Sequence, residues 1–256
     1  MSYETIHFAV EAGVATLTLA RADKLNALNE PMRREITAAV GRAGAEARVL
    51  VLTGEGRAFC TGQDLGVAGA DFDVGRILRE EYEPMLRAIY DCPVPTIAAV
   101  NGVAAGAGAN LALGCDVAIA AESAVFIQAF ARIGLVPDAG GTWWLPRQVG
   151  FARAMGAALF AEPVPARQAA DWGMIWQAVP DAEFAEVVRA RARRLADGPT
   201  AAYRLMKQAL RRGLASDLET QLALEAELQA QAGATRDFRE ALTAFLEKRP
   251  PRYEGR

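Results

Sequence analysis

The chain contains 256 residues, of which 52% are hydrophobic and 23% are charged, and its formal net charge is −3 at pH 7. This composition is typical of a globular protein with a sizeable core, and it excludes the strongly basic balance of many nucleic-acid-binding proteins. The three cysteines are far apart and there is a single histidine, so we expect neither a disulfide framework nor a metal site. Reduced thiols indicate a cytoplasmic protein.

Membrane segments and a signal peptide are not expected. The N-terminal residues lack a basic flank followed by an apolar run. Residues 94–121 contain no lysine or arginine and include the spacing Gly102-x-x-x-Gly106, which also occurs in membrane helices that pair. However, Pro95 and Asp116 interrupt this stretch, and the sequence offers no second apolar span to accompany it.

The chain is predicted to begin with a β-hairpin and a helix. Apolar and polar residues alternate over 6–10 and 14–19, which is the period of a half-buried strand. A polar loop over 21–28 follows. Asn29 can then cap a helix that has Pro31 in its first turn.

The middle of the chain alternates between short apolar strands and helices. Val49–Leu52 is a continuous apolar run, as expected for a strand that is covered on both faces. A glycine-rich loop over 54–65 leaves this strand, and the weakly patterned segment 66–75 is a candidate lid. The next elements are expected to be a helix over 77–90, a strand over 96–100, a helix over 104–113 and a strand over 117–120. This alternation predicts an α/β domain.

The residues after 146 are predicted to be mostly helical. Helices are expected over 151–160, 166–172, 182–196, 200–212, 216–231 and 236–248, with one more strand over 175–179. The last helices are more than the core requires, so they are candidates to pack on another subunit. We therefore expect a core over residues 1–196 and a helical oligomerisation region over residues 197–256.

Small residues crowd the segment 103–114, which allows the backbone to approach a ligand closely. Within it, Gly106-Ala107-Gly108 follows a predicted strand and opens a helix, as the dinucleotide-binding fingerprint does. The third glycine of that fingerprint is missing, because Leu111 occupies its position. Close packing of a small-residue helix is the simpler alternative.

One acidic residue, Asp138, stands in an otherwise uncharged and glycine-rich turn. Because Phe130, Leu135 and Val136 precede it, its carboxyl should be poorly solvated, and its pKa should be raised. Such a carboxylate can act as a general base. By itself, the position is more typical of a turn residue or of the cap of a helix that begins near Gly140, and only its neighbours favour the base.

Two main-chain N–H groups could complete a site for chemistry on a carbonyl group. The N–H of Cys60, in the glycine-rich loop, and the N–H of Ala107 could point into the same cavity. Two fixed N–H donors of this kind form an oxyanion hole, which stabilises a developing negative charge. Cys60 has no histidine partner, so we do not expect its thiol to be a nucleophile.

Three segments resemble the enoyl-CoA hydratase/isomerase (crotonase) superfamily, namely Arg57–Leu65, Ala99–Gly108 and Ile133–Thr142. The resemblance covers nearly the whole chain, including the ending over residues 245–250. It implies an α/β fold in which repeated ββα units form a spiral (ClpP-like), followed by a C-terminal helical trimerisation region. It also implies that the protein binds acyl-CoA thioesters and stabilises a thioester enolate with the N–H groups of Cys60 and Ala107.

Within this superfamily, the sequence departs from the hydratases, which use two glutamates to handle water. Asn110 and Phe130 occupy the matching positions, and neither side chain can transfer a proton at neutral pH. Asp138 stands where hydratases usually have glycine, and the run 128–143 is similar to the ring 1,2-epoxyphenylacetyl-CoA isomerases of phenylacetate degradation. The resemblance therefore implies an isomerase with Asp138 as its single general base. Its reaction would form oxepin-CoA from the ring epoxide, or shift a double bond from the 3- to the 2-position of an enoyl-CoA.

The sequence leaves two alternatives to the isomerase. Some 4-chlorobenzoyl-CoA dehalogenases also place an aspartate at the position of Asp138, where it serves as the nucleophile. They pair it with a histidine base, for which His7 on the first predicted strand is badly placed. A non-catalytic homologue that binds CoA esters would keep the fold and lose the base.

The resemblance also implies the remaining site residues and partners. The substrate pocket is expected to contain Gln63, Asp64, Leu65, Asn110, Phe130, Val136 and Trp143. The CoA moiety is expected to contact Lys24, Leu25, Ala58 and Lys248, the last of these in a neighbouring subunit. No cofactor is expected apart from the coenzyme A of the substrate. The expected assembly is a homotrimer or a dimer of trimers.

Overall fold

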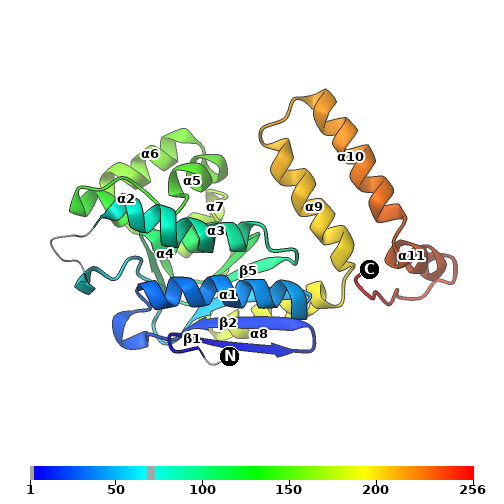
Figure 1. Ribbon diagram of the computed structural model, residues 1–256, viewed down its shortest axis with the longest axis horizontal. Coiled ribbons are helices and arrows are strands. Elements are labelled where there is room, and N and C mark those ends of the chain that lie inside the picture. The colour runs from blue at the N-terminus through cyan, green and yellow to red at the C-terminus, as the bar shows by residue number, and fades with distance from the viewer. Residues whose placement is uncertain (1–2, 68–72) are drawn as a thin grey trace.

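The computed structural model describes residues 3–67 and 73–256. Its main body contains two β-sheets covered by helices, and a C-terminal helical arm extends away from this body (Figure 1). The arm consists of α9, α10 and α11, which are drawn in yellow to red at the right of the view. The C-terminus lies near the start of α9.

The larger sheet has six strands in the order β1-β2-β3-β5-β7-β10. β1 and β2 are antiparallel and form the predicted hairpin, whereas all other neighbours in this sheet are parallel. The bounds are β1 Ile6–Glu11, β2 Val14–Leu19, β3 Val49–Gly54, β5 Thr96–Val100, β7 Val117–Ala121 and β10 Gln177–Val179.

The smaller sheet has four strands in the order β4-β6-β8-β9. β4, β6 and β8 are parallel, and β9 is antiparallel to β8. The bounds are β4 Ala58–Cys60, β6 Val103–Ala105, β8 Val125–Ile127 and β9 Val164–Pro165. Successive strands therefore alternate between the two sheets, because β3, β5 and β7 lie in the larger one and β4, β6 and β8 in the smaller one. This arrangement repeats a two-strand unit along the chain.

Helices and helical turns connect the strands and form the arm. The α-helices are α1 Glu30–Glu46, α2 Val74–Ile77, α3 Glu83–Tyr90, α4 Ala107–Leu113, α5 Gly141–Val149, α6 Phe151–Phe160, α7 Ala166–Asp171, α8 Asp181–Ala196, α9 Thr200–Gly213, α10 Leu218–Gly233 and α11 Arg236–Leu246. The shorter turns are η1 Ala22–Lys24, η2 Leu65–Val67, η3 Leu78–Tyr82 and η4 Ala129–Ile133. In the described parts of the chain, no helix is both long and apolar enough to cross a membrane.

The central parallel strands are covered on both faces, which confirms the prediction for the run 49–52. Val49 and Val51 belong to a cluster that includes Val188 of α8, whereas Leu50 and Leu52 belong to the main core. Alternate side chains of a strand point to opposite faces of the sheet. Neither face of β3 therefore meets water, and the strand contains no charged residue.

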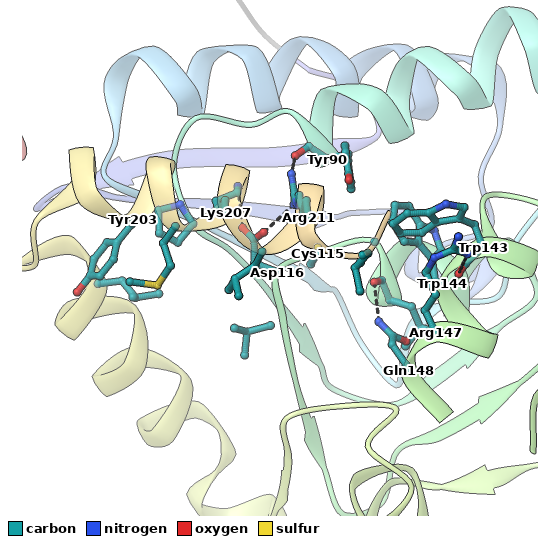
Figure 2. Close-up of a pocket in the computed structure, with 18 residues that line it drawn as sticks. Tyr90, Cys115, Asp116, Trp143, Trp144, Arg147, Gln148, Tyr203, Lys207 and Arg211 are labelled. Atoms are coloured by element: carbon teal, nitrogen blue, oxygen red, sulfur yellow. Dashed lines mark hydrogen bonds and ion pairs between the residues drawn. The ribbon is translucent and has the colours of Figure 1, made fainter. Parts of the chain in front are cut away.

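A charge network joins α9 to the body. Asp116, just before β7, is paired with Lys207 and Arg211 of α9, each at 2.7 Å (Figure 2). The Nζ of Lys207 also donates to the carbonyl oxygens of Cys92 at 2.7 Å and Val94 at 2.8 Å. The three charged side chains are only 12–19% exposed. The first helix of the arm is therefore held by ion pairs that are mostly withdrawn from water.

Several short elements differ from the prediction. The predicted glycine-rich loop 54–65 contains β4, and β8 was not predicted. The predicted helix over 104–113 begins only at Ala107, because Val103–Ala105 pairs with β4 and β8 as β6. The predicted lid over 66–75 falls largely on residues 68–72, which lie outside the described residues.

Candidate active site

A cavity of about 220 Å³ lies between the start of α4, the helical segment from α2 to η3, and η4. Its wall is largely apolar. The residues on this wall that the sequence analysis had proposed for the site are Gln63, Leu65, Ala107, Phe130 and Asp138. The structure thus brings together, around one hollow, residues that are up to 75 positions apart in the chain.

Asp138 is the one carboxylate among the described residues that line this cavity. Its Oδ1 is buried and has no hydrogen-bond partner in the described structure. Burial raises the pKa of the Asp138 carboxyl to about 6, because the charged form loses hydration and gains no donor in return. A carboxyl group with this pKa is ionised at neutral pH and is a stronger base than an ordinary aspartate, so it is suited to proton abstraction.

The turn that carries Asp138 has unusual backbone geometry. Ala139 has a φ of 48° and Gly140 a φ of 78°, so two successive residues are left-handed. For a non-glycine residue such as Ala139, this conformation costs about 1–2 kcal/mol. The turn is held by hydrogen bonds to the carbonyl oxygen of Asp138, from Gly141 N at 2.8 Å and Asn110 Nδ2 at 2.7 Å. The Nε1 of Trp144 also donates to the carbonyl oxygen of Ala139 at 3.2 Å.

Of the two residues with predicted amide donors, Ala107 is on the described wall of the cavity and Cys60 is not. Ala107 is the first residue of α4 and lines the cavity, and the first N–H groups of a helix have no partner within it. Gly62 packs closely against it, since a methyl group built on Gly62 would lie 3.1 Å from Ala107 N. Thr61 and Gly62 line the cavity, whereas Cys60 is fully buried directly behind them. The segment 60–62 and the start of α4 therefore share one wall.

The close approach of α4 to β4 depends on Gly108. A methyl group built on Gly108 would lie 2.2 Å from the carbonyl oxygen of Cys60. We expect Gly108→Ala to lower the free energy of unfolding by about 1–3 kcal/mol, because one of the two elements must move. Gly156→Ala in α6 is the matched control, since nothing lies within 4 Å of the added methyl group. It should raise the free energy of unfolding by about 0.5–1 kcal/mol. Urea denaturation measures both, and similar effects would contradict this packing.

Tyr82 is a polar residue of the cavity wall that the sequence analysis did not identify. It is 3% exposed, and its hydroxyl donates to Gln63 Oε1 at 2.8 Å. Arg33 Nη1 donates to the same oxygen at 2.8 Å, and its guanidinium lies 4.8 Å from the centroid of the Tyr82 ring. Burial raises the pKa of Tyr82, so its hydroxyl stays protonated at neutral pH. The Gln63 side chain is therefore fixed by two donors.

The position of Tyr82 follows from an irregularity in its helix. Residues 74–90 form one nearly continuous helical segment, as the sequence predicted for 77–90, but η3 is a π-helical turn within it. Pro84 follows this turn, and a proline inside a helix removes a hydrogen bond and clashes with the preceding turn. A wider turn accommodates this conflict. The apolar spacing of Ile77, Leu78 and Tyr82 was visible in the sequence, but it did not reveal which cavity this face would cover.

Four residues proposed for the substrate pocket lie outside the lining of this cavity. Asp64 is paired with Arg21 at 2.8 Å, and this hydrogen bond lowers the pKa of Asp64. Asn110 is completely buried behind the Asp138 turn. Val136 and Trp143 lie on an outer groove that Asp138 also borders. Asp138 therefore stands between the inner cavity and this groove.

The residues proposed for CoA binding fall into two groups. Lys24 and Leu25 lie in a loop that is joined to the segment after β4, because Thr61 N donates to Leu25 O at 3.2 Å. Ala58 is in β4, and its carbonyl oxygen accepts a hydrogen bond from Asn26 Nδ2 at 2.9 Å. Lys248 follows α11, and Figure 1 shows this helix on the opposite side of the molecule from α2 and α5. Within one chain, only the first group is near the cavity.

The histidine and the buried thiol offer no second catalytic group. His7 is on β1, and its Nε2 lies 3.8 Å from Glu55 Oε2 at the surface. Burial raises the pKa of the Cys60 thiol to about 12, so this thiol is not a nucleophilic thiolate at neutral pH. Among the described residues, no group of three or more histidine, cysteine or acidic side chains could hold a metal ion.

A larger hollow of about 510 Å³ lies between the body and α9 (Figure 2). Its acidic residue, Asp116, is neutralised by two cations. Burial raises the pKa of the Cys115 thiol beside it to about 12. The described lining of this hollow therefore offers no unpaired carboxylate comparable to that of Asp138 in the smaller cavity.

Comparisons with known proteins agree with this geometry. The family model described as enoyl-CoA hydratase/isomerase matches residues 9–256. A Rhodobacter capsulatus protein named probable enoyl-CoA hydratase is 61% identical, with 100% of both chains covered. The 1,2-epoxyphenylacetyl-CoA isomerase of Escherichia coli is 47% identical, with 96% of this chain and 97% of the relative covered. The crystal structure of an enoyl-CoA hydratase from Bacillus anthracis matches with a TM-score of 0.92 at 32% identity, over 99% of this chain and 100% of that chain. The fold is therefore the crotonase fold, and the chain belongs to the enoyl-CoA hydratase/isomerase family.

Proposed function

We propose that the protein is an acyl-CoA isomerase in which Asp138 is the single general base. The observation that carries this proposal is the Asp138 carboxyl group, which borders the cavity with one buried oxygen that no donor among the described residues satisfies. Burial raises the pKa of this carboxyl group, and its Oδ1 receives no compensating hydrogen bond from the described groups. Unpaired titratable groups with shifted pKa values are typical of catalytic positions.

In the proposed reaction, the thioester oxygen of a 3-enoyl-CoA accepts hydrogen bonds from the N–H groups of Cys60 and Ala107. Asp138 removes a proton from C2, and the electron pair of that C–H bond delocalises onto the thioester oxygen as a dienolate. The proton then returns from Asp138 to C4. The double bond moves from C3–C4 to C2–C3, and the carboxylate is regenerated. The two amides stabilise the negative charge that develops on the oxygen.

Hydration is disfavoured because it needs a second group to activate and orient water. In the described part of the chain, no other carboxylate lines the cavity. The position of one hydratase glutamate is taken by Asn110, whose amide is occupied by the Asp138 turn and by Gln128. The other is taken by Phe130, which is 6% exposed and apolar. Loss of one proton-transfer group typically costs about 10²- to 10⁴-fold in rate.

The finer proposal is that the substrates include 1,2-epoxyphenylacetyl-CoA, which would be converted to oxepin-CoA. Two features support it. The relative from Escherichia coli carries that name at 47% identity. The cavity also has a wall of Phe130, Ile77 and Leu78, which suits a flat apolar acyl group.

Product analysis tests the reaction type. A 3-enoyl-CoA and a 2-enoyl-CoA are incubated separately with the purified protein. The 2-enoyl-CoA formed from the first and the 3-hydroxyacyl-CoA formed from the second are quantified over time. We expect 2-enoyl-CoA to form at least about 100 times faster than the 3-hydroxyacyl product. The ring epoxide is assayed in parallel to decide the finer proposal. Hydration at a rate similar to isomerisation would contradict the one-base site.

We further propose that the arm joins copies of this chain into a homotrimer or a dimer of trimers. This proposal is supported by the large apolar side chains that the arm exposes although it has no hydrophobic core of its own. These side chains are Leu210, Leu214, Leu218, Phe238, Phe245 and Leu246, each more than half exposed. Such surfaces are typical of subunit interfaces. In such an assembly, Lys248 of one copy would be available to the CoA phosphates of another.

A further inference from the structure

The turn that carries Asp138 cannot hold its shape by local preference alone. Ala139 and Gly140, the two residues after Asp138, are both left-handed, with φ values of 48° and 78°. Strained backbone of this kind persists only where neighbouring groups fix it. The turn must therefore be held by its hydrogen bonds, and one of them comes from a side chain that is far away in the sequence.

That side chain is Asn110 of α4, which is completely buried. Its Nδ2 donates to the carbonyl oxygen of Asp138 at 2.7 Å. A methyl group built on Gly141 would lie 2.2 Å from the same nitrogen, so the first residue of α5 packs directly on the amide. The amide is therefore clamped between the Asp138 turn and α5 and has little room to rotate.

The direction of this amide is set by a second one. A carbonyl oxygen can only accept hydrogen bonds, so the Nδ2 of Asn110 must face Asp138 and its Oδ1 must face away. On that side, Gln128 Nε2 donates to Asn110 Oδ1 at 2.8 Å. Gln128 is only 4% exposed, and its Oε1 is left buried with no hydrogen-bond partner among the described groups. An unpaired buried acceptor lowers stability, so this arrangement is not explained by stability alone.

We propose that Asn110 and Gln128 are positioning residues, which aim the Asp138 carboxyl group into the cavity through two directed amide hydrogen bonds. The inference rests on the proposed function, because it takes Asp138 as the base. Gln128 orients Asn110, and Asn110 fixes the carbonyl of Asp138 and with it the strained turn. Neither side chain lines the cavity. Misplacing a catalytic group by about 1 Å can cost about 100-fold in rate.

The test compares Asn110→Leu and Gln128→Met with wild type in the isomerisation of a 3-enoyl-CoA. We expect kcat to fall about 10- to 100-fold in Asn110→Leu and about 3- to 10-fold in Gln128→Met, with KM changed less than about threefold. Gln148→Met is the matched control. Gln148 also has a buried Oε1 without a partner in the described structure, and its Nε2 donates to a main-chain oxygen, that of Leu113, at 3.2 Å. Its kcat should equal that of wild type.

A pH profile separates positioning from a purely structural role. In Asn110→Leu the released carboxyl group gains water, so the acid limb of kcat/KM should move about one pH unit lower. Two other ionisable groups on the described cavity wall, Tyr82 and Arg132, do not change charge in this range, because burial raises the pKa of Tyr82 and an arginine keeps its charge. A purely structural role would lower the folded fraction and leave this limb in place.

The possible outcomes distinguish a failure of this inference from a failure of the proposed function. If Asp138→Asn is inactive but Asn110→Leu and Gln128→Met keep the kcat and the acid limb of wild type, this inference is overturned and the proposed function stands. If Asp138→Asn is fully active, the proposed function itself fails. If Asn110→Leu does not fold, Gln128→Met decides, since it leaves Asn110 in place. A kcat loss that Gln148→Met reproduces counts against positioning.

Discussion

Replacing Asp138 by asparagine is expected to reduce kcat for isomerisation by about 10²- to 10⁴-fold, which is the usual contribution of one proton-transfer group. The amide has nearly the same shape but cannot accept the proton. The carbonyl oxygen of Asp138, to which Asn110 and Gly141 donate, is unchanged by the substitution. Steady-state kinetics with a 3-enoyl-CoA measure the loss. Asp171→Asn, the same change at an exposed residue of α7, should retain full activity.

The wild-type enzyme should also lose activity as the pH falls below about 6. The Asp138 carboxyl has a pKa of about 6, and only its ionised form is a base. The other ionisable side chains on the described outer groove are Arg79, Glu83, Arg87 and Tyr90, and those on the described cavity wall are Tyr82 and Arg132. A kcat/KM that stays constant down to pH 4.5 would remove Asp138 as the base.

The free energy of unfolding provides the control for Asp138→Asn, because this substitution should lower activity but raise stability. A carboxyl group whose pKa is raised by folding binds more protons in the native than in the unfolded state between about pH 4 and 6. The native state therefore loses stability as the pH rises through this window, by at most about 3 kcal/mol. Asp138→Asn avoids this loss, so at pH 8 it should be more stable than wild type. An inactive but stabilised variant shows that the activity was not lost through unfolding.

The second large effect is expected from Asp116→Ala, which should lower the free energy of unfolding by about 3 kcal/mol. Lys207 and Arg211 would lose the carboxylate that neutralises them while remaining 12% and 19% exposed. Leaving buried charges without their partner is far more costly than losing an exposed ion pair. Thr96 would lose an acceptor as well, because its N–H and hydroxyl both bond to Asp116 Oδ2. Urea denaturation measures the change.

Glu186→Ala is the matched comparison for this prediction. Glu186 pairs with Arg189 at 2.8 Å on α8, but both side chains are about 70% exposed. Exposed pairs contribute little, since water solvates both charges when they separate. We expect no measurable change in the midpoint of unfolding. Equal destabilisation by the two substitutions would mean that the α9 network is solvated like an ordinary surface pair.

The long elements of the fold could be predicted because each has a strong local signal. Asn29 caps α1 by accepting from Met32 N, as its position before Pro31 predicted. The run 49–52 is a strand covered on both faces. In contrast, β4, β6 and β8 have three residues each, which is too short to show a period. Their pairing exists only because the spiral brings them together, so no single segment encodes it.

The sequence predicted the proposed base of the site better than the residues that hold it in place. Asp138 could be identified because an acid in an apolar turn is conspicuous, and its placement beside a cavity is as expected. Asn110 was expected in the pocket, but the structure places it behind the turn, where its amide bonds to main chain. Tyr82 was not predicted, because its role depends on where a helix lies across the core. Asp64 looked available in sequence, but it is engaged by Arg21 from a loop 43 residues earlier.

A single acid on one side of the hollow has a stereochemical consequence. If Asp138 both takes and returns the hydrogen, it can reach only the face of the planar dienolate that is turned toward it. Departure and arrival must then occur on the same side, so the 1,3-transfer is suprafacial. The handedness of an isotopically labelled product is thereby decided by which wall carries the acid.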